Sequence, residues 1–293
     1  MRKIIIFYIF IAFNPYSGFA QKTRKVDVFM VYAITDSDST TKIKFITLIP
    51  NDIENKQKIN DIYFSVQPDT VFYRGNNKYA EFNLMKPIPE SIEIISNITT
   101  FNNDYKTVAQ GSPILDTTDL SRYLKSERWI DSEHPEILER AQKLMGKNEL
   151  STVKNIYNFV KKNIKYGGYI LEAQGSLLTL KTRKGDCTDY SHLMVALCRA
   201  SSIPARSISG LTATWRTTPK HEWVEVYFDG LGWVVFEPTQ GHYANFNVME
   251  NKYVSISPSG HDPDVMGEYF YWRYTYWGKK PEIEELFYSR FSR

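Results

Sequence analysis

The chain has 293 residues, with 36 lysines and arginines against 33 aspartates and glutamates. This length exceeds what one ordinary core holds and therefore favours two domains. A formal charge of +3 gives no electrostatic reason to expect a nucleic-acid partner.

Residues 1–20 have the pattern of an export signal. Arg2 and Lys3 precede an apolar stretch of about ten residues, and small residues around Gly18 and Ala20 follow. Such a stretch is too short to span a bilayer, which takes about 20 residues. We therefore predict cleavage near Ala20, export to the periplasm or the medium, and no transmembrane segment afterwards. An uncleaved N-terminal anchor is the alternative.

Residues 21–105 are predicted to form an antiparallel, immunoglobulin-like β-sandwich. Short segments rich in Val, Ile, Phe, Tyr and Thr alternate with turn-forming residues at regular spacing, as expected for such a domain. No residue here suggests chemistry. The expected strands cover 25–34, 42–50, 61–67, 70–84 and 91–100.

Residues 106–130 are expected to be a linker, and residues 131–293 to form a second domain of helices packed on an antiparallel sheet. The whole is thus an α+β protein. Apolar residues recur at helical spacing after Pro135, after Ser151 and from Cys187 to Ala200. Strands are expected at 205–211, 221–228 and 233–237. The aromatic tail from Phe246 to Phe291 is expected to close this domain.

Two cysteines in an exported chain first suggest a disulfide. If Cys187 and Cys198 share a helix, however, eleven residues separate their Cα atoms by roughly 16 Å. A disulfide needs Cα atoms within about 7 Å. We therefore expect two free thiols, with Cys198 on the apolar stripe as a core residue.

Cys187 is expected in the first turn of its helix, directly after Gly185 and Asp186. Unpaired backbone N–H groups and the helix dipole favour a thiolate there, and they can bind a developing oxyanion. These are two of the requirements of a cysteine nucleophile; the third is a base within reach. Position alone does not establish catalysis, because a cysteine at a helix start is often structural.

His221 is the candidate base, and strand parity decides whether a carboxylate can support it. Side chains of His221 and Glu237 share a face only if the loop of the hairpin between them has an odd number of residues. A three-residue loop, 229–231, makes them diagonal neighbours with backbones about 7 Å apart. Glu237 would then orient the imidazole and stabilise its cationic form. An even loop would separate them.

Residues 123–243 resemble the transglutaminase-like superfamily. The motifs that carry the resemblance are Gly-Asp-Cys-Thr-Asp-Tyr at 185–190, Leu-Cys-Arg-Ala at 197–200, Ile-Pro-Ala-Arg at 203–206, His-Glu-Trp-Val-Glu-Val-Tyr at 221–227, Gly-Trp-Val at 232–234 and Glu-Pro-Thr at 237–239. The resemblance implies a papain-like core that follows an N-terminal sandwich, as in exported bacterial members.

The resemblance also implies the site residues. Cys187 would be the nucleophile and His221 the base. The third position, usually aspartate in the family, is here Glu237, which is one methylene longer. Tyr166 is a weaker candidate near the oxyanion, set against simple packing at a helix end. Trp223 is expected to wall the substrate cleft.

No cofactor is expected, and no metal: a zinc site from the cysteines and histidines lacks the spacing that such sites use. His192, His242 and His261 lie in no matching motif. Calcium dependence, known in some relatives, has no visible ligand loop.

Three functions follow as alternatives. Acyl transfer from a peptide or isopeptide amide to water would make the protein a cysteine peptidase or amidase, and transfer to an amine would make it a transglutaminase. A protein or peptide, such as a cell-envelope component, would be the substrate. The third alternative is a binding or scaffolding module that kept the fold and lost turnover.

Overall fold

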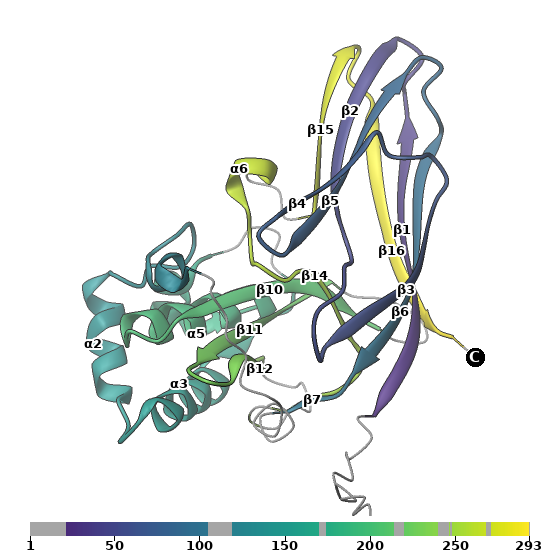
Figure 1. Cartoon of the computed structure of the whole chain (residues 1–293). Helices are drawn as coiled ribbons and strands as arrows, with labels where there is room; N and C mark the ends of the chain where they lie inside the picture. Colours follow the sequence, from purple (N-terminus) through teal and green to yellow (C-terminus); the bar gives the residue numbers. More distant parts are fainter. Residues whose placement is uncertain are drawn as a thin grey trace, which may run out of the picture.

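The computed structural model describes residues 22–104, 119–169, 174–213, 220–239, 246, 248–267 and 271–292. Figure 1 shows a tall pair of sheets, with helices and a shorter sheet lying to one side of its lower end. The expected signal peptide (1–20) and residues 106–118 of the expected linker (106–130) lie outside the described residues.

Two four-stranded antiparallel sheets form the tall unit, a β-sandwich. Along β6, buried residues alternate strictly with half-buried ones, as a strand with one face on a core requires. The first sheet has the order β16-β1-β6-β3, with β16 at Glu282–Phe291, β1 at Thr23–Thr35, β6 at Ser91–Phe101 and β3 at Gln57–Phe64. The second has the order β15-β2-β5-β4, with β15 at Trp272–Gly278, β2 at Thr40–Ile49, β5 at Asn77–Met85 and β4 at Thr70–Arg74.

The last two strands complete this sandwich, so the expectation that the aromatic tail closes the second domain is wrong for residues 272–291, although a strand at Tyr253–Ser257 does join the sheet of that domain. β16 pairs with β1 from Val26–Phe291 to Thr35–Glu282, and β15 pairs with β2. Trp272 packs against Phe45, a residue of the sandwich core. The alternation of apolar residues in the tail identifies a strand, but it does not specify the sheet that the strand joins.

The second domain consists of helices on a four-stranded antiparallel sheet of order β12-β11-β10-β14. Its strands are β10 at Ala205–Thr212, β11 at Lys220–Phe228, β12 at Gly232–Phe236 and β14 at Tyr253–Ser257. Its helices are α2 at Pro135–Leu144, α3 at Glu149–Asn163, α4 at Ser176–Thr182 and α5 at Cys187–Ala200. Shorter elements are η1 at Leu120–Leu124, α6 at Pro263–Met266, β7 at Asn103–Asp104, β8 at Lys165–Tyr166, β9 at Lys184–Gly185 and β13 at Val248–Met249.

Helix α5 is the centre of this domain, because every residue from Asp189 to Arg199 is buried. Its apolar side chains share one core with α2, α3 and the even-numbered residues Val224, Val226 and Phe228 of β11. Cys187 and Cys198 lie in this one helix and both are free thiols, which confirms that they form no disulfide.

The two domains share buried contacts and are not independent units. β14 hydrogen-bonds to β10, and its Val254 and Ile256 lie in the core of the sandwich. Gln57, at the start of β3, binds both backbone groups of Ser255. The sandwich therefore rests directly on the sheet that carries the candidate base.

Among the helices that the structure describes, none combines the length and the apolar character needed to cross a membrane.

Gly210, on β10, marks a close approach within the sheet of the second domain. A Cβ atom at this position would lie 2.2 Å from the carbonyl oxygen of Val254 and 2.4 Å from Cη2 of Trp223. Since one of these atoms belongs to the backbone, a side chain cannot fit unless the sheet shifts.

We expect Gly210→Ala to lower the melting temperature by about 2–12 °C, because overpacking of this kind costs roughly 1–3 kcal/mol. The matched control is Gly230→Ala. Gly230 has a φ of +74°, and a Cβ atom added there would meet nothing within 4 Å, so only backbone strain of about 1 kcal/mol applies. Calorimetry of the three proteins measures the difference, and equal losses would contradict the close packing at Gly210.

Candidate active site

Cys187 is the first residue of α5, as the sequence predicts. The helix begins there because Asp186 caps it: Oδ1 of Asp186 accepts hydrogen bonds from the backbone N–H groups of Thr188 (3.0 Å) and Asp189 (3.4 Å). Asp189 completes a capping box by accepting from the N–H of Asp186. This box does not use the N–H of Cys187 itself. The partly exposed thiol therefore lies at the positive end of the helix dipole.

The hairpin that carries His221 has the odd loop that the site requires. Phe228 pairs with Gly232 and Val224 with Phe236, so the turn contains residues 229–231. Of the odd and even loops that the sequence left open, the structure has the odd one. It places Glu237, directly after β12, on the same face as His221.

Glu237 contacts the imidazole through a hydrogen bond between its Oε2 and Nε2 of His221. Its other oxygen accepts from the backbone N–H of Thr239 (2.9 Å), and Oε2 also accepts from the hydroxyl of Tyr253 (3.2 Å). The carboxylate is 1 % exposed and yet well satisfied. The longer glutamate side chain therefore reaches the position that an orienting carboxylate needs.

His221 is 5 % exposed, and burial alone would lower its pKa. The charge of Glu237 and hydrogen bonds to Cys187 and Glu237 outweigh burial and raise the pKa of His221 to about 10. The imidazole is thus held in its cationic form at neutral pH. Because Glu237 occupies Nε2, Nδ1 is the ring nitrogen that remains for the thiol of Cys187.

Cys198 provides the contrast within the same helix. It is fully buried, and burial raises the pKa of its thiol well above the ordinary value. A thiol in such surroundings stays protonated and is a poor nucleophile.

Tyr166 lies close to Cys187, although the two are 21 positions apart in sequence. β8 and β9 form a short parallel pair in which Tyr166 is opposite Gly185. Burial and then the charges of Cys187 and Asp186 raise the pKa of the phenol, which keeps its proton available for donation. Tyr166 is half exposed, so it can face a ligand.

Trp223 does not wall a cleft as expected. It is 2 % exposed and belongs to a small core with Ile208 and Tyr253. Its ring lies 6.3 Å from that of His221 and packs edge-on against Tyr253 at 5.4 Å. Trp223 therefore packs beside His221 in the interior, because other elements cover both faces of β11.

His192 and His261 have partners of their own. His192 forms a buried pair with Glu222, and Nε2 of His261 donates a hydrogen bond to the carbonyl oxygen of Gly267. His242 lies outside the described residues. Within the part of the chain that the structure describes, no three His, Cys, Asp or Glu side chains are grouped as metal ligands.

Several residues of the site were not predicted. The pattern Asp186-x-x-Asp189 is a capping-box signal that could have been recognised in the sequence. Tyr253 had no such signal, since only the pairing of β14 with β10 brings it beside Glu237. Glu222 follows His221 directly, but its partners come from α5 and β10.

The comparisons with known proteins agree with this geometry. The family model described as the transglutaminase-like superfamily matches residues 139–238, a range that includes Cys187, His221 and Glu237. A crystal structure from Cytophaga hutchinsonii, described as a candidate cysteine protease, superposes with a TM-score of 0.62 at 20% identity. The superposition covers 92% of this chain and 98% of that one, and it shows a shared fold that includes the sandwich.

Two curated proteins, neither of them characterised, match shorter stretches. The protein YebA of Bacillus subtilis is 40% identical over 75 residues, which cover 21% of this chain and 10% of that protein. A protein of Haemophilus influenzae is 26% identical over 174 residues, which cover 53% of this chain and 46% of that protein. The chain thus spans less than half the length of either relative. Its fold, its motifs and the matching family model together show that this chain carries, within residues 139–238, a core domain of the transglutaminase-like superfamily.

Proposed function

We propose that the protein is a thiol enzyme that transfers acyl groups from peptide or isopeptide amide bonds. The observation that carries the proposal is the linked arrangement at Cys187, His221 and Glu237. The thiol is at a capped helix start, a cationic imidazole is within hydrogen-bond reach, and a buried carboxylate holds the far ring nitrogen. These are the three parts of a nucleophile–base–orienter site.

In the first step, His221 holds the proton of the thiol, and the Cys187 thiolate attacks the carbonyl carbon of the amide. A C–S bond forms and the carbonyl oxygen becomes an oxyanion. Collapse of this intermediate breaks the C–N bond, and His221 donates its proton to the departing amine. The product is a thioester on Cys187.

Two donors are available to the oxyanion. One is the backbone N–H of Cys187, which the capping box leaves unused, and the other is the hydroxyl of Tyr166. Donors placed in advance at the developing charge lower the barrier without a reorganisation cost. Tyr166 is thereby assigned to the stabilisation of the intermediate.

In the second step, His221 removes a proton from water or from an amine, which attacks the thioester and releases the acyl group. Water makes the protein a peptidase or amidase, and a lysine-like amine makes it a transglutaminase. We favour hydrolysis. The fold similarity to the candidate cysteine protease of Cytophaga hutchinsonii is consistent with that choice.

We further propose that the enzyme acts outside the cytoplasm, on a protein or peptide such as a component of the cell envelope. The support is the pattern of residues 1–20, with a basic start, an apolar stretch of about ten residues and a small-residue end.

Alkylation tests the nucleophile. With iodoacetamide at pH 6, we expect Cys187 to react at least about 100-fold faster than buried Cys198. His221→Ala should lower the Cys187 rate at this pH about tenfold or more, because the imidazolium no longer stabilises the thiolate. Peptide mass spectrometry from pH 5 to 9 measures both rates. An alkylation rate of Cys187 that is the same in wild type and His221→Ala would contradict the proposal.

Removal of the orienting charge tests Glu237. In Glu237→Gln the charge that most raises the pKa of His221 is lost while burial remains, so this pKa should fall from about 10. The acidic limb of the Cys187 profile, which is the rise of the alkylation rate with pH, should then move to higher pH. Glu139→Gln, on an exposed pair of α2, should change nothing.

The same substitution has a defined effect on stability. Since the folded-state pKa of His221 is raised, the stabilisation is complete below about pH 6.5 and is lost as the pH rises through about 10. The difference in melting temperature between wild type and Glu237→Gln should therefore be largest near pH 6 and narrow above pH 10. A difference that grows with pH would overturn the assignment.

Turnover is tested with peptide amides, in the presence and absence of a fluorescent primary amine. We expect amine release by the wild type and by Cys198→Ala, and none by Cys187→Ala. Incorporation of the fluorescent amine would identify transfer rather than hydrolysis. If Cys187 is reactive but the protein neither releases the amine nor incorporates the fluorescent amine, the binding module would be favoured.

A further inference from the structure

Glu222 is a second buried carboxylate beside the site, on the opposite face of β11 from His221. It shares that face with Val224 and Val226, which pack against α5. The residue is 5 % exposed. A carboxylate buried against a helix is costly unless several partners satisfy it.

Three elements supply partners for this carboxylate. Nε2 of His192, one turn along α5, lies 3.2 Å from Oε1, and the hydroxyl of Ser207 on β10 also bonds to Oε1. The hydroxyl of Thr188, in the first turn of α5, donates a further hydrogen bond. The imidazole of His192 lies parallel to the indole of Trp129, with centroids 6.2 Å apart.

Charge and hydrogen bonding favour the ionised forms of both His192 and Glu222. Burial would raise the pKa of Glu222, but the charge of His192 and the three hydrogen bonds keep it below its ordinary value. Burial would lower the pKa of His192, but Glu222, Asp189 and Glu127 together raise it. Burial and then the charge of Glu222 raise the pKa of Tyr271, the residue before β15.

These contacts join the two segments that carry the chemistry. Thr188 is the residue after Cys187, and Glu222 is the residue after His221. One carboxylate thus ties the first turn of α5 to β11, next to both reacting groups. In such a site, a misplacement of about 1 Å can cost on the order of 100-fold in rate.

We propose that Glu222 is a positioning residue that holds the Cys187 thiol within hydrogen-bond reach of His221. The proposal rests on the function proposed above, because it assigns Glu222 a role in forming the thiolate–imidazolium pair. His192 balances the charge of Glu222. The hydroxyl of Thr188 donates a hydrogen bond to the same carboxylate at the start of α5.

The strand offers a matched control in Glu225. Glu225 is also a buried carboxylate with ionic partners, but it faces the sandwich, where Lys56 and Arg206 bind it. Loss of either carboxylate weakens the fold. Only loss of Glu222 should alter the pairing of the thiol and the imidazole.

The experiment measures the rate of alkylation of Cys187 by iodoacetamide from pH 5 to 9 in the full chain. For Glu222→Ala we expect a rate at pH 6 at least about tenfold below wild type and an acidic limb shifted to higher pH. Glu222→Gln, which keeps an oxygen for Thr188 and Ser207, should recover most of the rate. Thr188→Val, an isosteric change that removes only the hydroxyl, should give a smaller loss of the same kind. Glu225→Gln should keep the wild-type profile.

Cys198 reports folding in the same samples, because it stays protected from the reagent only while α5 is packed. A wild-type pH profile in Glu222→Ala and in Thr188→Val, with Cys198 still protected, would overturn the positioning role. A shift of equal size in Glu225→Gln would do the same. If Cys187 of the wild type is no more reactive than Cys198, the proposed function itself fails, and that outcome is distinct from the other two.

Discussion

The three-residue turn between β11 and β12 is the constraint on which the site depends. Side chains alternate strictly along a strand, so one residue more or fewer in this turn would move Glu237 to the opposite face from His221. With the observed register, the carboxylate reaches Nε2, the pKa of the imidazole rises to about 10, and Nδ1 is left for the thiol. The length of this turn thereby sets the charge state of the base.

Burial of charge on both sides of β11 follows a common rule. Glu222, Glu225 and Glu237 all lie in the interior, and each has a cationic partner together with further hydrogen bonds. Ionised groups remain in a low-dielectric interior only under such conditions. Each carboxylate therefore ties the sheet to a different neighbour: Glu237 to His221 and Tyr253, Glu222 to α5, and Glu225 to the sandwich.

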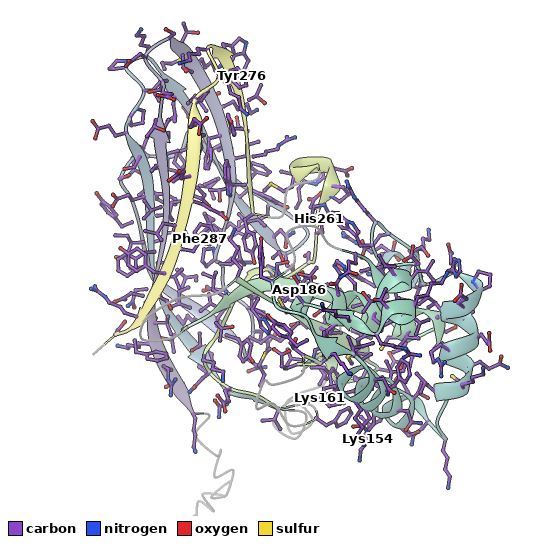
Figure 2. All side chains as sticks on the ribbon, turned by 180° about the vertical axis from the view of Figure 1, so that it is seen from behind. Lys154, Lys161, Asp186, His261, Tyr276 and Phe287 are labelled. Atoms are coloured by element: carbon purple, nitrogen blue, oxygen red, sulfur yellow. The ribbon has the colours of Figure 1, made fainter. Side chains whose placement is uncertain are left out.

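The sandwich supports the site directly and does not merely precede it. Lys220, next to His221, binds Glu285 of β16 and lies 4.8 Å over the ring of Tyr271. The hydroxyl of Tyr271 donates to the carbonyl of Gly210, which is opposite His221 in the sheet. Figure 2 shows Asp186 at the centre of the molecule, between the strand that carries Phe287 and the helix that carries Lys161.

The sequence by itself determined the parts of this protein that are encoded locally. Helix periodicity predicted α5 with Cys187 in its first turn, and alternation with a glycine-bearing turn predicted the hairpin, whose register the sequence left open between an odd and an even loop. Only the tertiary structure decided which segments far apart in the chain come together. Pairing of β15 and β16 with the sandwich, burial of Trp223, and the contacts of Tyr253 and Glu222 all join distant positions. Local patterns specify a strand and its faces, whereas its partner depends on which apolar surfaces remain to be covered once the whole chain has folded.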